Sequence, residues 1–185
     1  MIMLKYVKAE NYLCFMALLE MVLIDVLETD VFDQYNLAEL FGITLPINTP
    51  SHIKNVTYSD KPREYGCHID EYKLNLFFRN TAIPLQTTYF RVNPYEDIYI
   101  DEYGNDEVRQ GKYIIYTYSY GSLYKENQSI EFGHVSLLED VISERKLRIY
   151  DPGPRNVGVK IVDRIAMYEA MRCINAGIYV INRNE

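Results

Sequence analysis

The sequence changes character at Pro84, and this change constrains the fold more than any other feature. Before it, apolar residues recur every three or four positions, which predicts helices over 13–28, 36–41 and 70–80. After it, β-branched and aromatic runs predict strands, which we expect over 85–92, 113–120, 134–139, 146–150 and 178–181, with one more helix over 165–173. Helices followed by mostly antiparallel strands are typical of an α+β fold.

One domain over 1–185 is expected, because no stretch of linker composition interrupts the chain. A chain of 185 residues, 48% of them hydrophobic, can bury a substantial core without metal or disulfide support. The segment 44–60 contains Pro46 and Pro50 among several Ser, Thr and Asn residues, so we predict a loop there.

The charge balance argues against nucleic-acid and membrane partners. The net charge is −7, and Lys and Arg are scattered, so binding would release few counterions from a nucleic acid. The longest apolar run, 13–27, is interrupted by Glu20 and Asp25 and is too short to span a bilayer. The N-terminus lacks the pattern of a signal peptide, so cytoplasmic residence is expected. The sequence does not specify an oligomeric state.

The cysteines argue against a metal or a disulfide framework. Cys14, Cys67 and Cys173 are widely spaced, and no C-x-x-C pair is present. We therefore expect free thiols, no metal site and no cofactor.

Cys14 lies where the first predicted helix begins, with Asn11 just upstream as an N-cap. Unpaired N–H groups at a helix N-terminus stabilise a thiolate, and they can also bind the oxyanion formed when that thiolate attacks a carbonyl. The alternative is structural, because cysteine is also a common small buried residue.

His134 and Asp151 are predicted to meet across a hairpin. His134 opens one strand and Asp151 ends the next, so the hairpin brings them together, and an aspartate there would fix the tautomer of the imidazole. Alternatively His134 is a solvated strand-end residue, and Asp151 belongs to a turn with Pro152 and Gly153.

Four short motifs, in this order and spacing, resemble the C39-like branch of the papain-like cysteine peptidases. They are Asn11-Tyr12-Leu13-Cys14, residues 37–43, Gly133-His134-Val135 and Tyr150-Asp151-Pro152-Gly153. The resemblance covers 11–181 and implies a papain-like fold with N-terminal helices packed on the sheet. It also implies Cys14 as nucleophile, His134 as general base and Asp151 as orienting acid. The substrate would be a peptide or an acylated small molecule, cleaved or transferred through a covalent thioester.

Two positions depart from that family. Lys8 stands where the family has a glutamine that donates to the oxyanion, and Phe15 stands where it has glycine. Asn11 could supply a substitute donor. The alternative is a catalytically inactive fold that serves as a binding or regulatory module.

We expect the segments 44–60 and 94–110 to flank the cleft. Acidic residues of the second segment would favour a cationic or amine-bearing substrate, or they form a solvated acidic loop; they are Glu96, Asp97, Asp101, Glu102, Asp106 and Glu107.

Overall fold

The computed structural model describes residues 4–92, 112–126 and 132–184, which form two compact units. The first unit comprises Met1–Ile69 and Pro152–Gly158, and the second comprises Asp70–Asp151 and Val159–Glu185. Each unit has its own secondary structure and its own buried residues. That the whole chain is a single domain stays a prediction.

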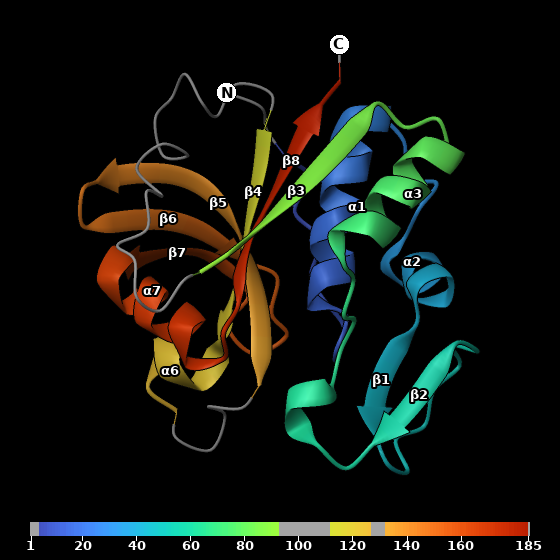
Figure 1. Cartoon of the computed structure of the whole chain (residues 1–185), viewed down its shortest axis with the longest axis horizontal. Coiled ribbons are helices and arrows are strands. Elements are labelled where there is room, and N and C mark those ends of the chain that lie inside the picture. Colours follow the sequence, from blue (N-terminus) through green and yellow to red (C-terminus); the bar gives the residue numbers. More distant parts are fainter. Residues whose placement is uncertain (1–3, 93–111, 127–131, 185) are drawn as a thin grey trace. The chain divides into compact units, whose positions relative to one another are not determined.

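The first unit is built on α1 (Cys14–Leu27), with α2 (Gln34–Phe41) beside it (Figure 1). Eight residues of α1 between Phe15 and Leu23 are buried, and they lie all round the helix as expected for a helix inside a core. Both predicted helices are therefore confirmed, with slightly different ends.

Two short strands of a small parallel sheet lie at the ends of the segment 44–60, for which we predicted a loop, and residues 47–55 between them form no helix or strand. Strand β1 (Ile43–Pro46) pairs with β2 (Val56–Ser59), and the 3₁₀ helix η1 (Pro62–Glu64) follows. The loop prediction was wrong for the two strands only, because each has four residues, too few to show an alternating pattern. Thr44 and Gly66 also exchange backbone hydrogen bonds of 2.9 and 2.8 Å.

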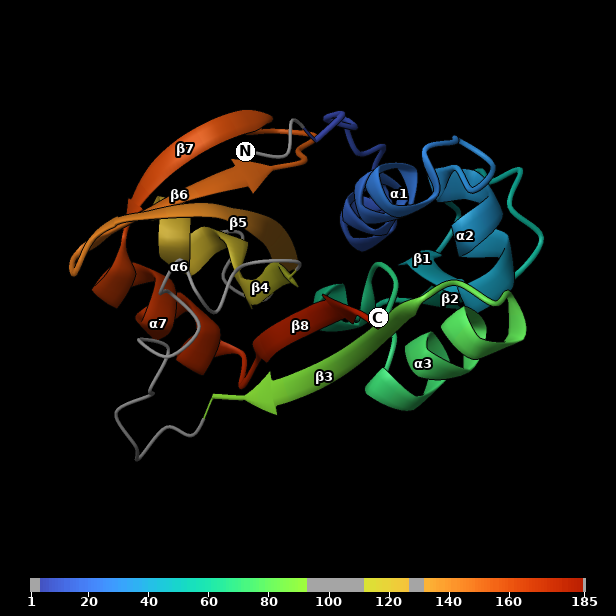
Figure 2. The same cartoon turned by 90° about the horizontal axis from the view of Figure 1, so that it is seen from above.

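The second unit contains a six-stranded sheet in the order β3-β8-β4-β5-β6-β7. Pairing is antiparallel from β3 through β8, β4 and β5 to β6, which confirms the α+β prediction. The strands are β3 (Leu85–Arg91), β4 (Lys112–Ser119), β5 (Gly133–Ser143), β6 (Lys146–Asp151), β7 (Gly158–Asp163) and β8 (Gly177–Arg183). Strands β5 to β7 arch over helix α6 (Tyr120–Tyr124) in Figure 2.

The core of this unit lies between the sheet and two helices, α6 and α7 (Arg164–Cys173). It combines alternate residues of β4 with residues of β6, β8 and α7, including Ile114, Tyr116, Tyr118, Leu147, Ile149, Met167, Met171, Ile178 and Val180. Helix α3 (Glu71–Asn80) packs against β3. Three helices begin at an aspartate whose carboxylate accepts a backbone N–H: Asp33 for α2, Asp70 for α3 and Asp163 for α7.

Two elements of this unit were not predicted. Helix α6 is only five residues long and contains Gly121 and Ser122, which are typical of turns. Strand β7 exposes Val159 and Ile161 on its outer face, so its sequence lacks the alternation of apolar and polar residues that marks a half-buried strand.

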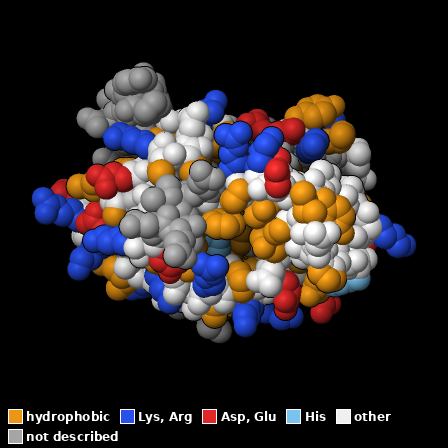
Figure 3. All heavy atoms as spheres, turned by 90° about the horizontal axis from the view of Figure 1, so that it is seen from below, with side chains coloured by type: hydrophobic (Ala, Val, Ile, Leu, Met, Phe, Trp, Pro, Cys, Tyr) orange, Lys and Arg blue, Asp and Glu red, His pale blue; other side chains and the backbone are white. Residues whose placement is uncertain are grey.

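Among the helices of residues 4–92, 112–126 and 132–184, none is long and apolar enough to cross a bilayer. On the face drawn in Figure 3, Lys and Arg side chains are interspersed with Asp and Glu side chains. The expectation that nucleic acid is not a partner stays a prediction.

We predict that Gly177→Ala lowers the free energy of unfolding by about 1–3 kcal/mol, the usual range for overpacking. A Cβ atom at Gly177 would lie 2.2 Å from the carbonyl oxygen of Phe90 on the paired strand β3, so the backbones would have to separate. Urea denaturation followed by circular dichroism measures the loss.

The matched control is Gly133→Ala in β5 of the same sheet. Its Cβ atom would approach nothing closer than Ile174 Cδ1 at 3.9 Å, so a change within about 0.5 kcal/mol is expected. Equal denaturation midpoints for the two variants would contradict the steric argument.

Candidate active site

His134 and Asp151 form a buried pair in the second unit. Strand β5 pairs with β6 so that Leu137 faces Tyr150, and Asp151 lies one residue further along β6. His134 Nε2 lies 2.8 Å from Asp151 Oδ1. The Asp151 side chain has no exposed surface and that of His134 is 8% exposed, so water screens this contact little.

The contact fixes the chemical roles of the two ring nitrogens. A carboxylate oxygen accepts, so Nε2 carries the proton that it donates to Asp151. Nδ1 is then the nitrogen with which His134 would exchange a proton with a nucleophile. A carboxylate placed in this way holds the tautomer and stabilises the imidazolium.

Two tyrosine rings flank the imidazole. Tyr118 pairs with His134 across β4 and β5, and their ring centroids lie 5.6 Å apart at 86°. Tyr120, the first residue of α6, lies 5.2 Å from the imidazole at 89°. Both are edge-to-face contacts, which restrict the orientation of the His134 ring.

The second oxygen of Asp151 accepts a hydrogen bond from Tyr124. The Tyr124 hydroxyl lies 2.5 Å from Asp151 Oδ2 and comes from the last residue of α6. Burial raises the pKa of Tyr124, and the negative charge of Asp151 raises it further, so the phenol keeps its proton. Sequence reasoning missed this residue, although the tyrosine-rich run that leads into α6 was a visible signal.

Cys14 lies in the first unit, at the first position of α1. The prediction that Asn11 caps this helix was wrong. The cap position is Leu13, which makes no side-chain hydrogen bond. Asn11 lies in the preceding turn, which is closed by a hydrogen bond of 3.0 Å from Leu13 N to Glu10 O. Tyr12 has a φ of 68°, a left-handed conformation that is uncommon for a bulky residue.

Gln34 holds the segment that leads into this turn. Its side-chain oxygen accepts from Glu10 N at 2.9 Å, and its amide donates to Lys8 O at 3.1 Å. Its own backbone N–H donates to Glu20 of α1 at 2.8 Å. The Lys8 side chain is exposed, and the residue is held by the hydrogen bond from Gln34 to its backbone oxygen.

Cys67 packs near Cys14 in the same unit. The rings of Tyr12 and Tyr65 lie 5.7 Å apart, and a Cβ atom on Gly66 would lie 3.5 Å from Tyr12 O. Burial raises the pKa of Cys67 to about 12, and the nearby Cys14 thiol adds to this shift. Cys67 is therefore protonated at neutral pH.

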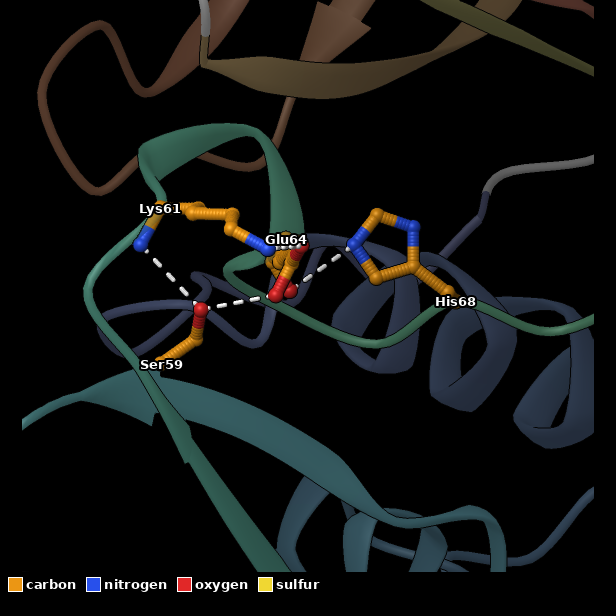
Figure 4. A network of polar contacts seen from close by, with 4 residues as sticks. All are labelled: Ser59, Lys61, Glu64 and His68. Carbon is orange, nitrogen blue, oxygen red and sulfur yellow. Dashed lines mark hydrogen bonds and ion pairs between the residues drawn. The ribbon is translucent and has the colours of Figure 1, made fainter.

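His68, next to Cys67, contacts the backbone of the preceding turn. Its Nε2 lies 3.0 Å from Glu64 O, and the Glu64 carboxylate accepts from Ser59 at 2.7 Å and pairs with Lys61 at 3.2 Å (Figure 4). The hydrogen bond from Ser59 lowers the pKa of Glu64. This network orders the turn that carries Cys67.

Within residues 4–92, 112–126 and 132–184, no group of three or more His, Cys, Asp and Glu side chains could hold a metal ion. The acidic segment 94–110, predicted to flank the cleft, lies outside the described residues.

We predict that iodoacetamide alkylates Cys67 far more slowly than the exposed Cys173. With a pKa of about 12, roughly one Cys67 thiol in ten thousand is thiolate at pH 8, against about one in four for an ordinary cysteine. Peptide mass spectrometry over a time course measures each rate. In urea the two rates should become equal, and equal rates in the folded protein would contradict the prediction.

Comparison with known proteins supports the architecture. No family model matches the chain, and no curated protein matches it. Among solved structures, the fold resembles a crystal structure from Bacillus anthracis of a candidate C39-like peptidase, with a TM-score of 0.60. The two sequences are 14% identical, and the match covers 99% of this chain and 96% of the other. At that identity the likeness shows a shared fold and nothing finer.

Proposed function

We propose that this chain is a papain-like cysteine hydrolase or acyltransferase that acts on an amide, a peptide or a thioester. Cys14 is the nucleophile, His134 the general acid and base, and Asp151 the orienting acid. The observation that carries the proposal is the buried pair in which His134 Nε2 donates to Asp151 at 2.8 Å. It is supported by the position of Cys14 at the start of α1 and by the fold shared with a candidate C39-like peptidase.

The reaction has two halves, each with one proton transfer through His134. The Cys14 thiolate attacks the carbonyl carbon and forms a C–S bond, and the bond to the leaving group breaks as the imidazolium protonates that group. A water or an amine then attacks the thioester and gives its proton to His134, and the thiolate leaves. Asp151 stabilises the imidazolium in both halves.

The oxyanion of this reaction needs donors other than the glutamine that Lys8 replaces. We propose backbone N–H groups in the first turn of α1, because such groups lack intrahelical partners. Asn11 is the second donor in this proposal, since it lies in the turn before Cys14. No cofactor is required. The substrate would be a peptide or an acylated small molecule, in the cytoplasm.

A binding or regulatory module is the second candidate. Lys8 is exposed rather than directed into a site, and Phe15 is buried in the core of the first unit. Both departures weaken oxyanion stabilisation without disturbing the fold. Such a protein would keep the pair of His134 and Asp151 but would not acylate Cys14.

We predict that acyl thioesters and short peptides, presented as a library, leave an acyl adduct on Cys14 detectable by mass spectrometry. Cys14→Ala should abolish the adduct, and His134→Ala should slow its formation by about a hundredfold or more, the usual contribution of a general base. Cys173→Ala removes an exposed thiol on α7 and should leave the rate unchanged.

Alkylation gives a second readout that needs no substrate. Below pH 7, iodoacetamide should modify Cys14 faster than a model thiol, and His134→Ala should remove that advantage. An unreactive Cys14 that is indifferent to His134→Ala, with no adduct from the library, would contradict the enzyme and favour the binding module.

A further inference from the structure

Three side chains extend the pair of His134 and Asp151 into a chain of hydrogen bonds inside the second unit. Tyr124 of α6 donates to Asp151 Oδ2 at 2.5 Å and is also hydrogen-bonded to Tyr118 of β4. The Tyr118 hydroxyl in turn lies 2.7 Å from Ser136 Oγ of β5. Tyr118, Ser136 and Asp151 have no exposed surface.

The direction of these hydrogen bonds follows from counting protons. A carboxylate can only accept, so the single proton of Tyr124 is used on Asp151 and its oxygen accepts from Tyr118. The proton of Tyr118 is then used on Tyr124, and Ser136 must donate to Tyr118. All three hydroxyls therefore point toward Asp151, an arrangement in which each hydrogen bond polarises the next.

We propose that Tyr124, supported by Tyr118 and Ser136, is the positioning residue that holds Asp151 as an ionised carboxylate directed at His134. The inference rests on the proposed function, in which His134 transfers protons for Cys14. Two donors hold the two oxygens, His134 on Oδ1 and Tyr124 on Oδ2, so the carboxylate plane cannot turn. Without Tyr124, a buried oxygen would lose its donor, and the carboxylate would rotate or take up a proton.

The protonation of the two tyrosines agrees with this role. Burial raises the pKa of Tyr118 well above its usual value, and the charge of Asp151 raises it further, so both phenols keep their protons at neutral pH. His134, Tyr118, Tyr124 and Tyr150 are among the titratable groups that interact with Asp151.

The test is Tyr124→Phe, which keeps the ring and removes only the hydroxyl. Acylation of Cys14 should slow about tenfold, the loss expected for one hydrogen bond to a buried charge. Tyr118→Phe, one step further along the chain, should slow it about two- to threefold. In the background of Asp151→Asn, Tyr124→Phe should change the acylation rate less than twofold further, because both variants break the same chain of hydrogen bonds.

The matched control is Tyr116→Phe. Tyr116 lies two residues from Tyr118 on β4, faces the same side of the sheet and is equally buried. Its loss removes the same atom without touching the chain, so rates within about twofold of the parent are expected.

A titration of the His134 ring by NMR separates this inference from the proposed function, because it needs no substrate. Tyr124→Phe should lower the midpoint by about half a unit or more, since a carboxylate that has turned away or taken up a proton stabilises the imidazolium less. Tyr116→Phe should leave it unchanged.

A shifted midpoint in a chain that acylates nothing would support the positioning role and contradict the enzyme. A parent-like midpoint and a parent-like rate in Tyr124→Phe would overturn the positioning role and leave the enzyme standing. Should Tyr124→Phe fail to fold, Tyr118→Phe gives the same two readouts with smaller changes.

Discussion

The carboxylate of Asp151 is the group on which the candidate chemistry of the second unit depends. A charge without exposed surface is costly unless neighbouring groups replace its water, and here an imidazole and a phenol do so. The imidazole comes from β5, the phenol from α6 and the carboxylate itself from β6, so the sheet register and the short helix must both be formed before the carboxylate is satisfied. The electrostatics of the site therefore depend on the local fold.

Strand pairing explains why several polar side chains lie on one face of the sheet. Tyr118 lies opposite His134 and Tyr116 opposite Ser136, and residues opposite each other share a face. Residues two apart on a strand also share a face, so Asp151 lies on the side of Ile149, toward the core with α7. A register shift of one residue would move every one of these side chains to the other face.

The sequence allowed part of this arrangement to be predicted. The meeting of His134 and Asp151 follows from a hairpin that local patterns reveal, and hairpin geometry is a short-range property. The contribution of Tyr124 could not be predicted, because α6 is five residues long and begins where Gly121 suggested a turn. The β1 and β2 strands were missed for the same reason, since their pairing depends on contacts with distant residues such as Gly66 rather than on their own four-residue sequences. The roles of Cys14 and Asn11 depend on reactivity, which no pattern measures.

Stability alone gives no reason for the hydrogen-bond chain. Buried ionic and polar groups can often be replaced by apolar residues of similar size at no cost or with a gain, provided that all partners are replaced together. Asp151, Tyr118 and Ser136 share their face with His134 and Tyr116, and the other core residues on that side are mostly Leu, Ile, Met and Val. A hydrogen-bond chain that ends on an imidazole and fixes its tautomer is what the proposed proton transfer would require. The buried donors around Asp151 therefore support the proposed enzyme, whereas Lys8 and Phe15 support the binding module.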